Sequence, residues 1–228
     1  MIKAVIFGAS TILLTLAALV SPKAATSAPA LEPMPATVQI VHTWQSTASQ
    51  TVYEATAESL GTVIAPHLIL THNHYGYTLG RQSSGMLAIT DSAHHVWRVP
   101  VAKAQLVMIN AGTSLLLWPY DLPMPVAPVA DDADLQRLTA GKWITVNCWD
   151  DNTQGITRRD FQIIQVKDGI ARLADPDRVI RPGDSGGGAY FNGKLIGNTW
   201  SINLDSTNHP AGSFNVALLP TQVHSYVP

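Results

Sequence analysis

Short apolar runs, each bounded by residues typical of turns, dominate the 228-residue chain from about residue 38 onward. Helical periodicity of any length is absent outside the N-terminal leader. Apolar runs of about four to eight residues between turn signals are typical of β-strands, and many of them at regular spacing favour a sandwich or a barrel. The sequence therefore predicts an all-β protein.

The expected strands fall into two groups. They cover 51–58, 61–65, 67–71, 86–90, 96–101, 104–109 and 113–118, and then 143–149, 160–166, 169–174, 188–191, 194–202 and 213–218. Between the groups, residues 122–130 (LPMPVAPVA) carry three prolines, which are excluded from central strands. We therefore expect one β-unit over 31–125 and a second over 126–228, with a helical turn near 131–138 and a short helix near 220–227.

The N-terminus has the layout of a secretory signal peptide. A lysine at position 3 precedes 17 apolar or small residues (4–20), and small residues with alanine-rich cleavage contexts follow up to residue 30. We assign 1–30 to a signal peptide and spacer, and expect a secreted or cell-surface protein that has no membrane contact after cleavage. An uncleaved anchor is the alternative, although the apolar run is at the short edge for a bilayer span.

Composition excludes several classes of protein. Hydrophobic residues make up 46% of the chain and charged residues 13%, so a sizeable core is expected. The net charge is −2, and no basic stripe indicates nucleic-acid binding. The single cysteine, Cys148, excludes an internal disulfide, and we expect it to act as a small buried hydrophobe. No histidine has metal-ligand spacing, so no metal or other cofactor is expected.

The segment 181–190 (RPGDSGGGAY) holds the main candidate for chemistry. Glycines at this density mark backbone that turns sharply or approaches another group closely. In such a turn the Ser185 hydroxyl can stand clear of the chain while the N–H groups of Gly183 and Ser185 point into one small space. Two such donors stabilise a developing oxyanion. A glycine-rich hairpin turn with an incidental serine is the alternative, but the pattern Gly-Asp-Ser-Gly-Gly-Gly is too particular to favour it. A nucleophile also needs a base, which the rest of the chain has to supply.

A candidate base follows a predicted strand. The segment GTVI at 61–64 is followed by LILTHNHY at 68–75, so His74 would stand at the rigid end of a strand. Together with the Gly-Asp-Ser-Gly-Gly motif, and in the order His before Ser, this resembles the trypsin-like serine proteases of chymotrypsin fold, especially the secreted bacterial type without disulfides. The likeness extends loosely from about Thr51 to Leu219.

The resemblance implies two six-stranded antiparallel β-barrels with a short C-terminal helix. It implies a serine endopeptidase, expected as a monomer, that acts on protein or peptide substrates through an acyl-enzyme. Ser185 would be the nucleophile and His74 the base, and the Gly183 and Ser185 N–H groups would form the oxyanion hole. His72 competes as the base, but we prefer His74 because of its place in the motif.

The third member of the triad is missing from its expected position. The family pattern Asp-x-Ala-Leu-Leu matches the strand at 113–118 when Ser114 takes the alanine position, and this places Gly112 where the aspartate belongs. Asn110, two residues earlier, is a possible substitute that would orient the imidazole without adding charge. Asp91 and Asp121 are two further candidate carboxylates for this role.

Asp184 also needs a partner. In the animal enzymes it pairs with a new N-terminus, but the candidate start at Ile40 lacks the glycines and follows no basic residue. We therefore expect the Asp184 carboxylate to contact another partner or solvent.

Two other functions fit parts of the sequence. A catalytically impaired protease homologue that serves as a secreted binding module is favoured by Gly112. The nucleophile elbow of α/β-hydrolases is also matched by Gly-x-Ser-x-Gly, but that fold needs a helix after the serine. A strand and an Asn-Gly hairpin follow Ser185 instead, so the sequence does not favour an esterase of this class.

Overall fold

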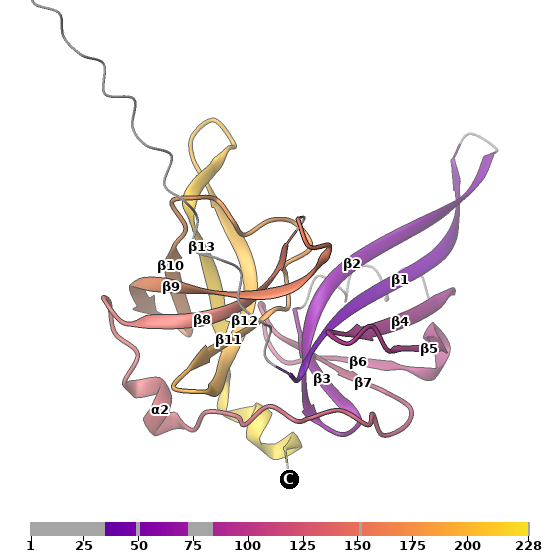
Figure 1. The fold of residues 1–228 in the computed structure, drawn as a ribbon, viewed down its shortest axis with the longest axis horizontal. Coiled ribbons are helices and arrows are strands. Elements are labelled where there is room, and N and C mark those ends of the chain that lie inside the picture. Colours follow the sequence, from indigo (N-terminus) through magenta and orange to yellow (C-terminus); the bar gives the residue numbers. More distant parts are fainter. Residues whose placement is uncertain (1–34, 49–50, 73–83, 151, 228) are drawn as a thin grey trace, which may run out of the picture.

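The computed structural model describes residues 35–48, 51–72, 84–150 and 152–227. Its strands form two units that lie side by side, with the C-terminal segment at the lower edge of the view in Figure 1. The predicted all-β architecture in two units is confirmed. The signal peptide and spacer predicted for 1–30 lie outside the described residues, and so does His74.

The first unit is a seven-stranded antiparallel sheet with the strand order β5-β4-β1-β2-β3-β7-β6. Its strands are β1 (Thr37–Ala48), β2 (Thr51–Ala65), β3 (Leu68–Thr71), β4 (Met86–Asp91), β5 (Val96–Pro100), β6 (Gln105–Met108) and β7 (Ser114–Leu117), with a 3-10 turn η1 (Val101–Lys103) between β5 and β6. Among the described strands the two outer ones, β5 and β6, do not pair, so this unit is a curled open sheet rather than a closed six-stranded barrel.

One strand of the first unit, β1, was not predicted. It pairs with β2 along its whole length and with β4 over residues 38–43, so it lies inside the sheet. Its sequence, TVQIVHTWQSTA, contains many polar residues and only a short apolar stretch. The two strands predicted at 51–58 and 61–65 are one continuous strand, β2, because Gly61 continues the pairing with β1.

The second unit is a closed six-stranded barrel, as expected, with the order β10-β13-β12-β11-β8-β9. Its strands are β8 (Trp143–Asp150), β9 (Gly155–Lys167), β10 (Ile170–Ala174), β11 (Gly188–Phe191), β12 (Lys194–Leu204) and β13 (Pro210–Leu218). The predicted Asn192-Gly193 turn joins β11 to β12, and both residues have positive φ (51° and 79°), as a type I′ hairpin turn requires.

Each unit has its own apolar core. The second core contains Phe161 and Phe214, whose rings meet edge to face at 4.9 Å, and the buried Cys148 lies among its members. Burial raises the pKa of the Cys148 thiol to about 12, so it is an inert core residue, as predicted. The predicted C-terminal helix is a 3-10 segment, η2 (Thr221–Tyr226), and its Val223 is buried in the core of the first unit.

The connector between the units is bonded to both of them. The Ala127 N–H donates to the Val63 carbonyl of β2, and the Ala130 N–H donates to the Leu195 carbonyl of β12. The predicted helical turn is α2 (Asp132–Gln136), which begins with a capping box of Asp131 and Asp134. The domain boundary predicted at 125/126 lies within this connector.

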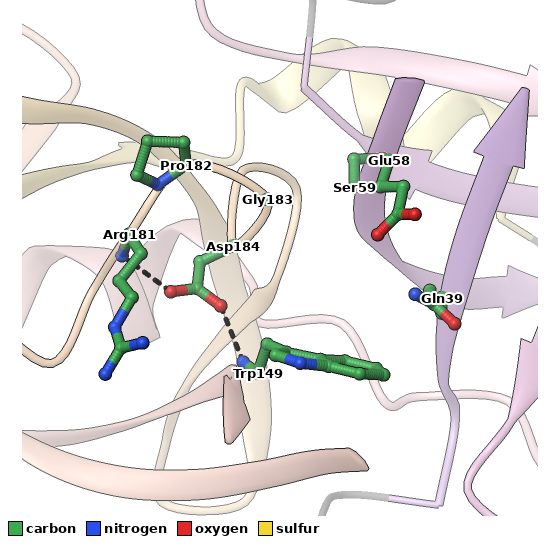
Figure 2. Close-up of a pocket in the computed structure, with 8 residues that line it drawn as sticks. All are labelled: Gln39, Glu58, Ser59, Trp149, Arg181, Pro182, Gly183 and Asp184. Atoms are coloured by element: carbon green, nitrogen blue, oxygen red, sulfur yellow. Dashed lines mark hydrogen bonds between the residues drawn. The ribbon is translucent and has the colours of Figure 1, made fainter. Parts of the chain in front are cut away.

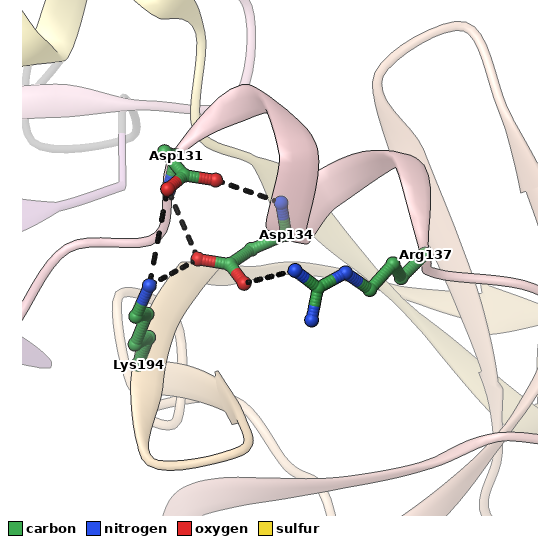
Figure 3. A network of polar contacts seen from close by, with 4 residues as sticks. All are labelled: Asp131, Asp134, Arg137 and Lys194. Atoms are coloured by element: carbon green, nitrogen blue, oxygen red, sulfur yellow. Dashed lines mark hydrogen bonds and ion pairs between the residues drawn. The ribbon is translucent and has the colours of Figure 1, made fainter.

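Helix α2 is also tied to the β11–β12 hairpin by charge. Figure 3 shows Lys194 reaching Asp134 at 2.6 Å and Asp131 at 3.9 Å, while Arg137 lies 3.8 Å from Asp134 on the other side. The bond from Lys194 lowers the pKa of the Asp134 carboxyl. These contacts hold the end of the connector on the second barrel.

Candidate functional site

The serine turn, residues 181–187, consists of two successive turns that lead into β11. The Asp184 N–H donates to the Arg181 carbonyl at 3.1 Å, and the Gly187 N–H donates to the Asp184 carbonyl at 3.0 Å. Gly183 and Gly186 have φ values of +105° and +88°, which L side chains rarely adopt. The glycine-rich sequence is therefore required by the backbone of the turn itself.

Both units hold the turn. The Leu60 N–H of β2 donates to the Ser185 carbonyl at 2.9 Å, and the Leu60 carbonyl accepts from the Thr71 hydroxyl at 2.8 Å. From the second barrel, the Thr199 carbonyl accepts from the Gly186 N–H at 2.8 Å. A Cβ at Gly186 would collide with the Leu60 carbonyl oxygen, so the two units approach this closely only because residue 186 is glycine.

The N–H groups of Gly183 and Ser185 donate to no acceptor among the described residues. The Ser185 hydroxyl likewise has no hydrogen-bond partner there, and the side chain is half-buried. The turn thus presents a hydroxyl and two unused N–H donors close together in sequence. The assignment of these two N–H groups to an oxyanion hole stays a prediction.

Asp184 finds its partners within the backbone. Its carboxylate accepts from the Trp149 N–H at 2.5 Å and from the Arg181 N–H at 2.7 Å (Figure 2). Burial raises the pKa of the Asp184 carboxyl to about 6, and the two N–H bonds and the nearby Arg181 charge limit that rise. The Asp184 carboxylate is therefore bound by the backbone near the end of β8, where Trp149 lies, and not by a new N-terminus.

The candidate bases follow β3. This strand ends at Thr71, whose hydroxyl bonds the same Leu60 carbonyl that lies next to the serine turn. The chain therefore leaves β3 close to Ser185. His72, the competing base, is buried with 5% of its surface exposed, and His74 lies outside the described residues.

The position expected for the triad acid is closed by packing. Gly112 is buried, and a Cβ there would lie 2.6 Å from the Ala217 Cβ and 3.3 Å from two ring carbons of Trp200. The Gly112 carbonyl accepts from Asn198 Nδ2 at 2.9 Å, and Thr113 donates its hydroxyl to Asn198 Oδ1 at 2.9 Å. The segment is thus fixed against β12 and β13, with no space for a carboxylate at residue 112.

The possible substitutes for the acid are engaged elsewhere. The Asn110 side chain is exposed, and its Oδ1 accepts from the Gly112 and Thr113 N–H groups at 2.8 and 2.9 Å. Asp91 closes the β4–β5 hairpin and pairs with His95 at 2.9 Å. Asp121 is 80% exposed and lies 3.6 Å from His67. Each of these groups therefore makes a local contact in a turn or at the surface.

Several solved structures have the same overall architecture as this chain. They include the scabies mite inactivated protease paralogue S-I1, with 10% identity over 84% of this chain and 92% of that chain and a TM-score of 0.61. They also include HL collagenase (13% identity, 87% and 98% covered, TM-score 0.63) and the HtrA-type protease AlgW with a tripeptide (15% identity, 86% and 59% covered, TM-score 0.58). The chain has the chymotrypsin-like serine protease fold.

Comparison of sequences alone does not show this fold. No protein-family model matches the sequence, and no curated protein matches it. The chymotrypsin-fold structures include both proteases and inactivated paralogues, so the fold is compatible with either kind of protein. Within the described ranges, no helix is long and apolar enough to span a bilayer, and no cluster of His, Cys, Asp or Glu side chains is arranged to hold a metal ion.

A pocket of about 200 Å³ lies between the first sheet and the serine turn of this chymotrypsin-like fold (Figure 2). Its walls are Gln39, Glu58, Ser59, Trp149, Arg181, Pro182, Gly183 and Asp184. Gly183 and Asp184 directly precede Ser185, and Ser59 precedes Leu60, which bonds the Ser185 carbonyl. The pocket therefore adjoins the candidate nucleophile. Sequence reasoning missed it, because its walls come from four separate segments of the chain.

Proposed function

We propose that the protein is a serine endopeptidase with Ser185 as nucleophile and His74 as general base. The observation that carries the proposal is the serine turn. It is held by both units, and it leaves the Ser185 hydroxyl and two N–H donors without protein partners among the described residues. These donors and the hydroxyl are thus available to a substrate, which an oxyanion hole beside a nucleophile requires.

In this proposal the Ser185 hydroxyl oxygen attacks the carbonyl carbon of the scissile peptide bond, and His74 accepts its proton. The N–H groups of Gly183 and Ser185 stabilise the negative charge that develops on the carbonyl oxygen. The C–N bond then breaks, the leaving amine takes the proton from His74, and water releases the acyl group in the second half of the reaction.

The packing of Gly112 makes slow turnover the expected behaviour. In a chymotrypsin-type triad the acid holds the imidazole in the correct tautomer and stabilises its positive charge. Replacing that acid by asparagine lowers kcat by about 10⁴-fold in the reference case. Since residue 112 has no space for a carboxylate, we expect a Ser–His pair that works without the full electrostatic support of a triad.

The second candidate is a catalytically impaired homologue that binds proteins. It is favoured by the same closed position at Gly112, and two of the structures with this fold are described as inactivated protease paralogues. For either candidate we propose export through the N-terminal signal peptide and a protein or peptide as the partner.

A fluorophosphonate probe, which reacts with activated serines, separates the two candidates. We expect labelling of the wild-type protein that disappears in Ser185→Ala and falls sharply in His74→Ala. His72→Ala is the matched control and should keep most of the labelling if His74 is the base. Folded wild-type protein that does not react with the probe would overturn the peptidase proposal and favour the binding module.

A further inference from the structure

The pocket beside the serine turn has an unbalanced charge. Glu58 is exposed on β2, and its carboxylate has no hydrogen-bond or ion-pair partner within the part of the chain that the structure describes. On the opposite wall, burial raises the pKa of the Asp184 carboxyl to about 6, and the nearby positive charge of Arg181 limits that rise. The positive charge of Arg181 and the negative charge of Asp184 offset one another. The negative charge of Glu58 is therefore available to a ligand in the pocket.

The pocket also offers an aromatic surface. Figure 2 shows the Trp149 indole extending across the gap between Asp184 and Gln39, while the Glu58 carboxylate faces the same gap from above. The Arg181 guanidinium is directed away from Glu58 in this view. A carboxylate and an indole that line the same pocket suit a cation, because both groups attract positive charge.

The size and position of the pocket indicate what kind of cation it would take. A volume of about 200 Å³ is smaller than the roughly 300–1,000 Å³ typical of small-ligand sites. A single side chain therefore suits it better than a whole ligand. Since Gly183 and Asp184 form part of the wall, that side chain would belong to a residue close to the bond that Ser185 attacks.

We propose that this pocket binds an arginine or lysine side chain of the substrate next to the scissile bond, held by the Glu58 carboxylate and the face of Trp149. The proposal names the substrate class for the peptidase proposed above and rests on it. Binding itself does not need turnover, however, so it is measured separately from catalysis.

The test is an NMR titration of isotope-labelled Ser185→Ala protein, followed at the indole N–H of Trp149 and assigned with Trp149→Phe. The ligands are the methylamides of acetyl-arginine and acetyl-citrulline, which have nearly the same shape and differ in charge. We expect arginine to bind about fivefold more tightly, the size expected from one partly exposed ion pair with a cation–π contact. The ratio should fall as salt is raised.

Two variants identify the group responsible. Glu58→Gln should bring the arginine-to-citrulline ratio close to one, and Glu58→Lys should reverse the preference toward acetyl-glutamate methylamide. Glu54→Gln is the matched control, because Glu54 is an exposed glutamate on the same strand but does not line the pocket, and it should keep the full ratio.

Equal affinities for arginine and citrulline, or a ratio that survives Glu58→Gln, would overturn the pocket assignment. The fluorophosphonate result is independent of this one. Charge-selective binding without probe labelling would leave a basic-residue binding site on an inactive homologue. Probe labelling without selectivity would leave a peptidase whose specificity lies elsewhere.

Discussion

Gly112 offers the most direct test of why the triad acid is missing. Its φ is not in the left-handed region, so the backbone would accept another residue. The obstacle is the neighbouring side chain, because a Cβ at residue 112 would lie 2.6 Å from the Ala217 Cβ. That methyl group is attached directly to the backbone of β13 and cannot rotate away. We therefore predict that Gly112→Ala destabilises the fold.

The magnitude follows from two opposing effects. Replacing glycine by alanine at a compatible position stabilises a protein by about 0.4–1 kcal/mol, through the entropy of the unfolded chain. Forcing an extra methyl group into a well-packed site costs about 1–3 kcal/mol. The second effect is larger here, because the clash involves a rigid Cβ and the ring of Trp200. The net expected loss is about 1–2 kcal/mol in the free energy of unfolding.

Urea denaturation with a double-mutant cycle measures this effect. Ala217→Gly removes the clashing methyl group, so Gly112→Ala should cost much less in that background, and the coupling energy should be about 1–2 kcal/mol. Gly155→Ala is the matched control. Its Cβ would lie no closer than 3.7 Å to the nearest atom, and we expect it to be neutral or slightly stabilising.

The same cycle bears on catalysis. If Gly112 occupies the acid position, Gly112→Asp with Ala217→Gly should react faster with the fluorophosphonate probe than Ala217→Gly alone. An unchanged stability in Gly112→Ala, with no coupling to residue 217, would refute the packing argument. The missing acid would then need another explanation.

Two further predictions concern polar groups near the site. Because the folded-state pKa of Asp184 is raised to about 6 from 3.8, its contribution favours the folded state at low pH and is lost as pH rises through about 6. The stability of wild type relative to Asp184→Asn should therefore fall by up to about 3 kcal/mol between about pH 3.5 and 6.5, measured by denaturation at each pH, and a constant difference would contradict the burial argument. Asn110→Ala should lose about 1 kcal/mol of stability by leaving two N–H groups uncapped, whereas Asn110→Asp keeps the acceptor. A fall in probe labelling at unchanged stability would instead make Asn110 an orienting residue.

Local patterns predicted most of the strands. The runs predicted at 86–90 and 143–149 correspond to β4 and β8, because short apolar runs between turn residues are typical of buried strands. The Asn192-Gly193 turn was equally clear, since few residue pairs accept two positive φ values. β1 was missed because its partners on both sides come from distant segments, and pairing on both sides stabilises a polar sequence that local propensity does not favour.

In the serine turn, too, the local features were predicted and the long-range contacts were not. Its glycines predicted a sharp turn, and Gly183 and Gly186 have the positive φ values that favour glycine. The sequence also indicated that Asp184 would contact another partner or solvent rather than a new N-terminus. It gave no indication that the Trp149 N–H would be that partner, since the two residues are 35 positions apart.

By itself, the amino-acid sequence determined the all-β class, the two units joined by a proline-rich connector, and the turn that presents Ser185. These features depend on backbone preferences and on apolar patterns that are local in the chain. Only the tertiary structure decided that residue 112 is closed by Ala217 and Trp200, and that Glu58 and Trp149 share a pocket with the serine turn. Such contacts join residues far apart in sequence, and their distances exist only once the two units have packed together.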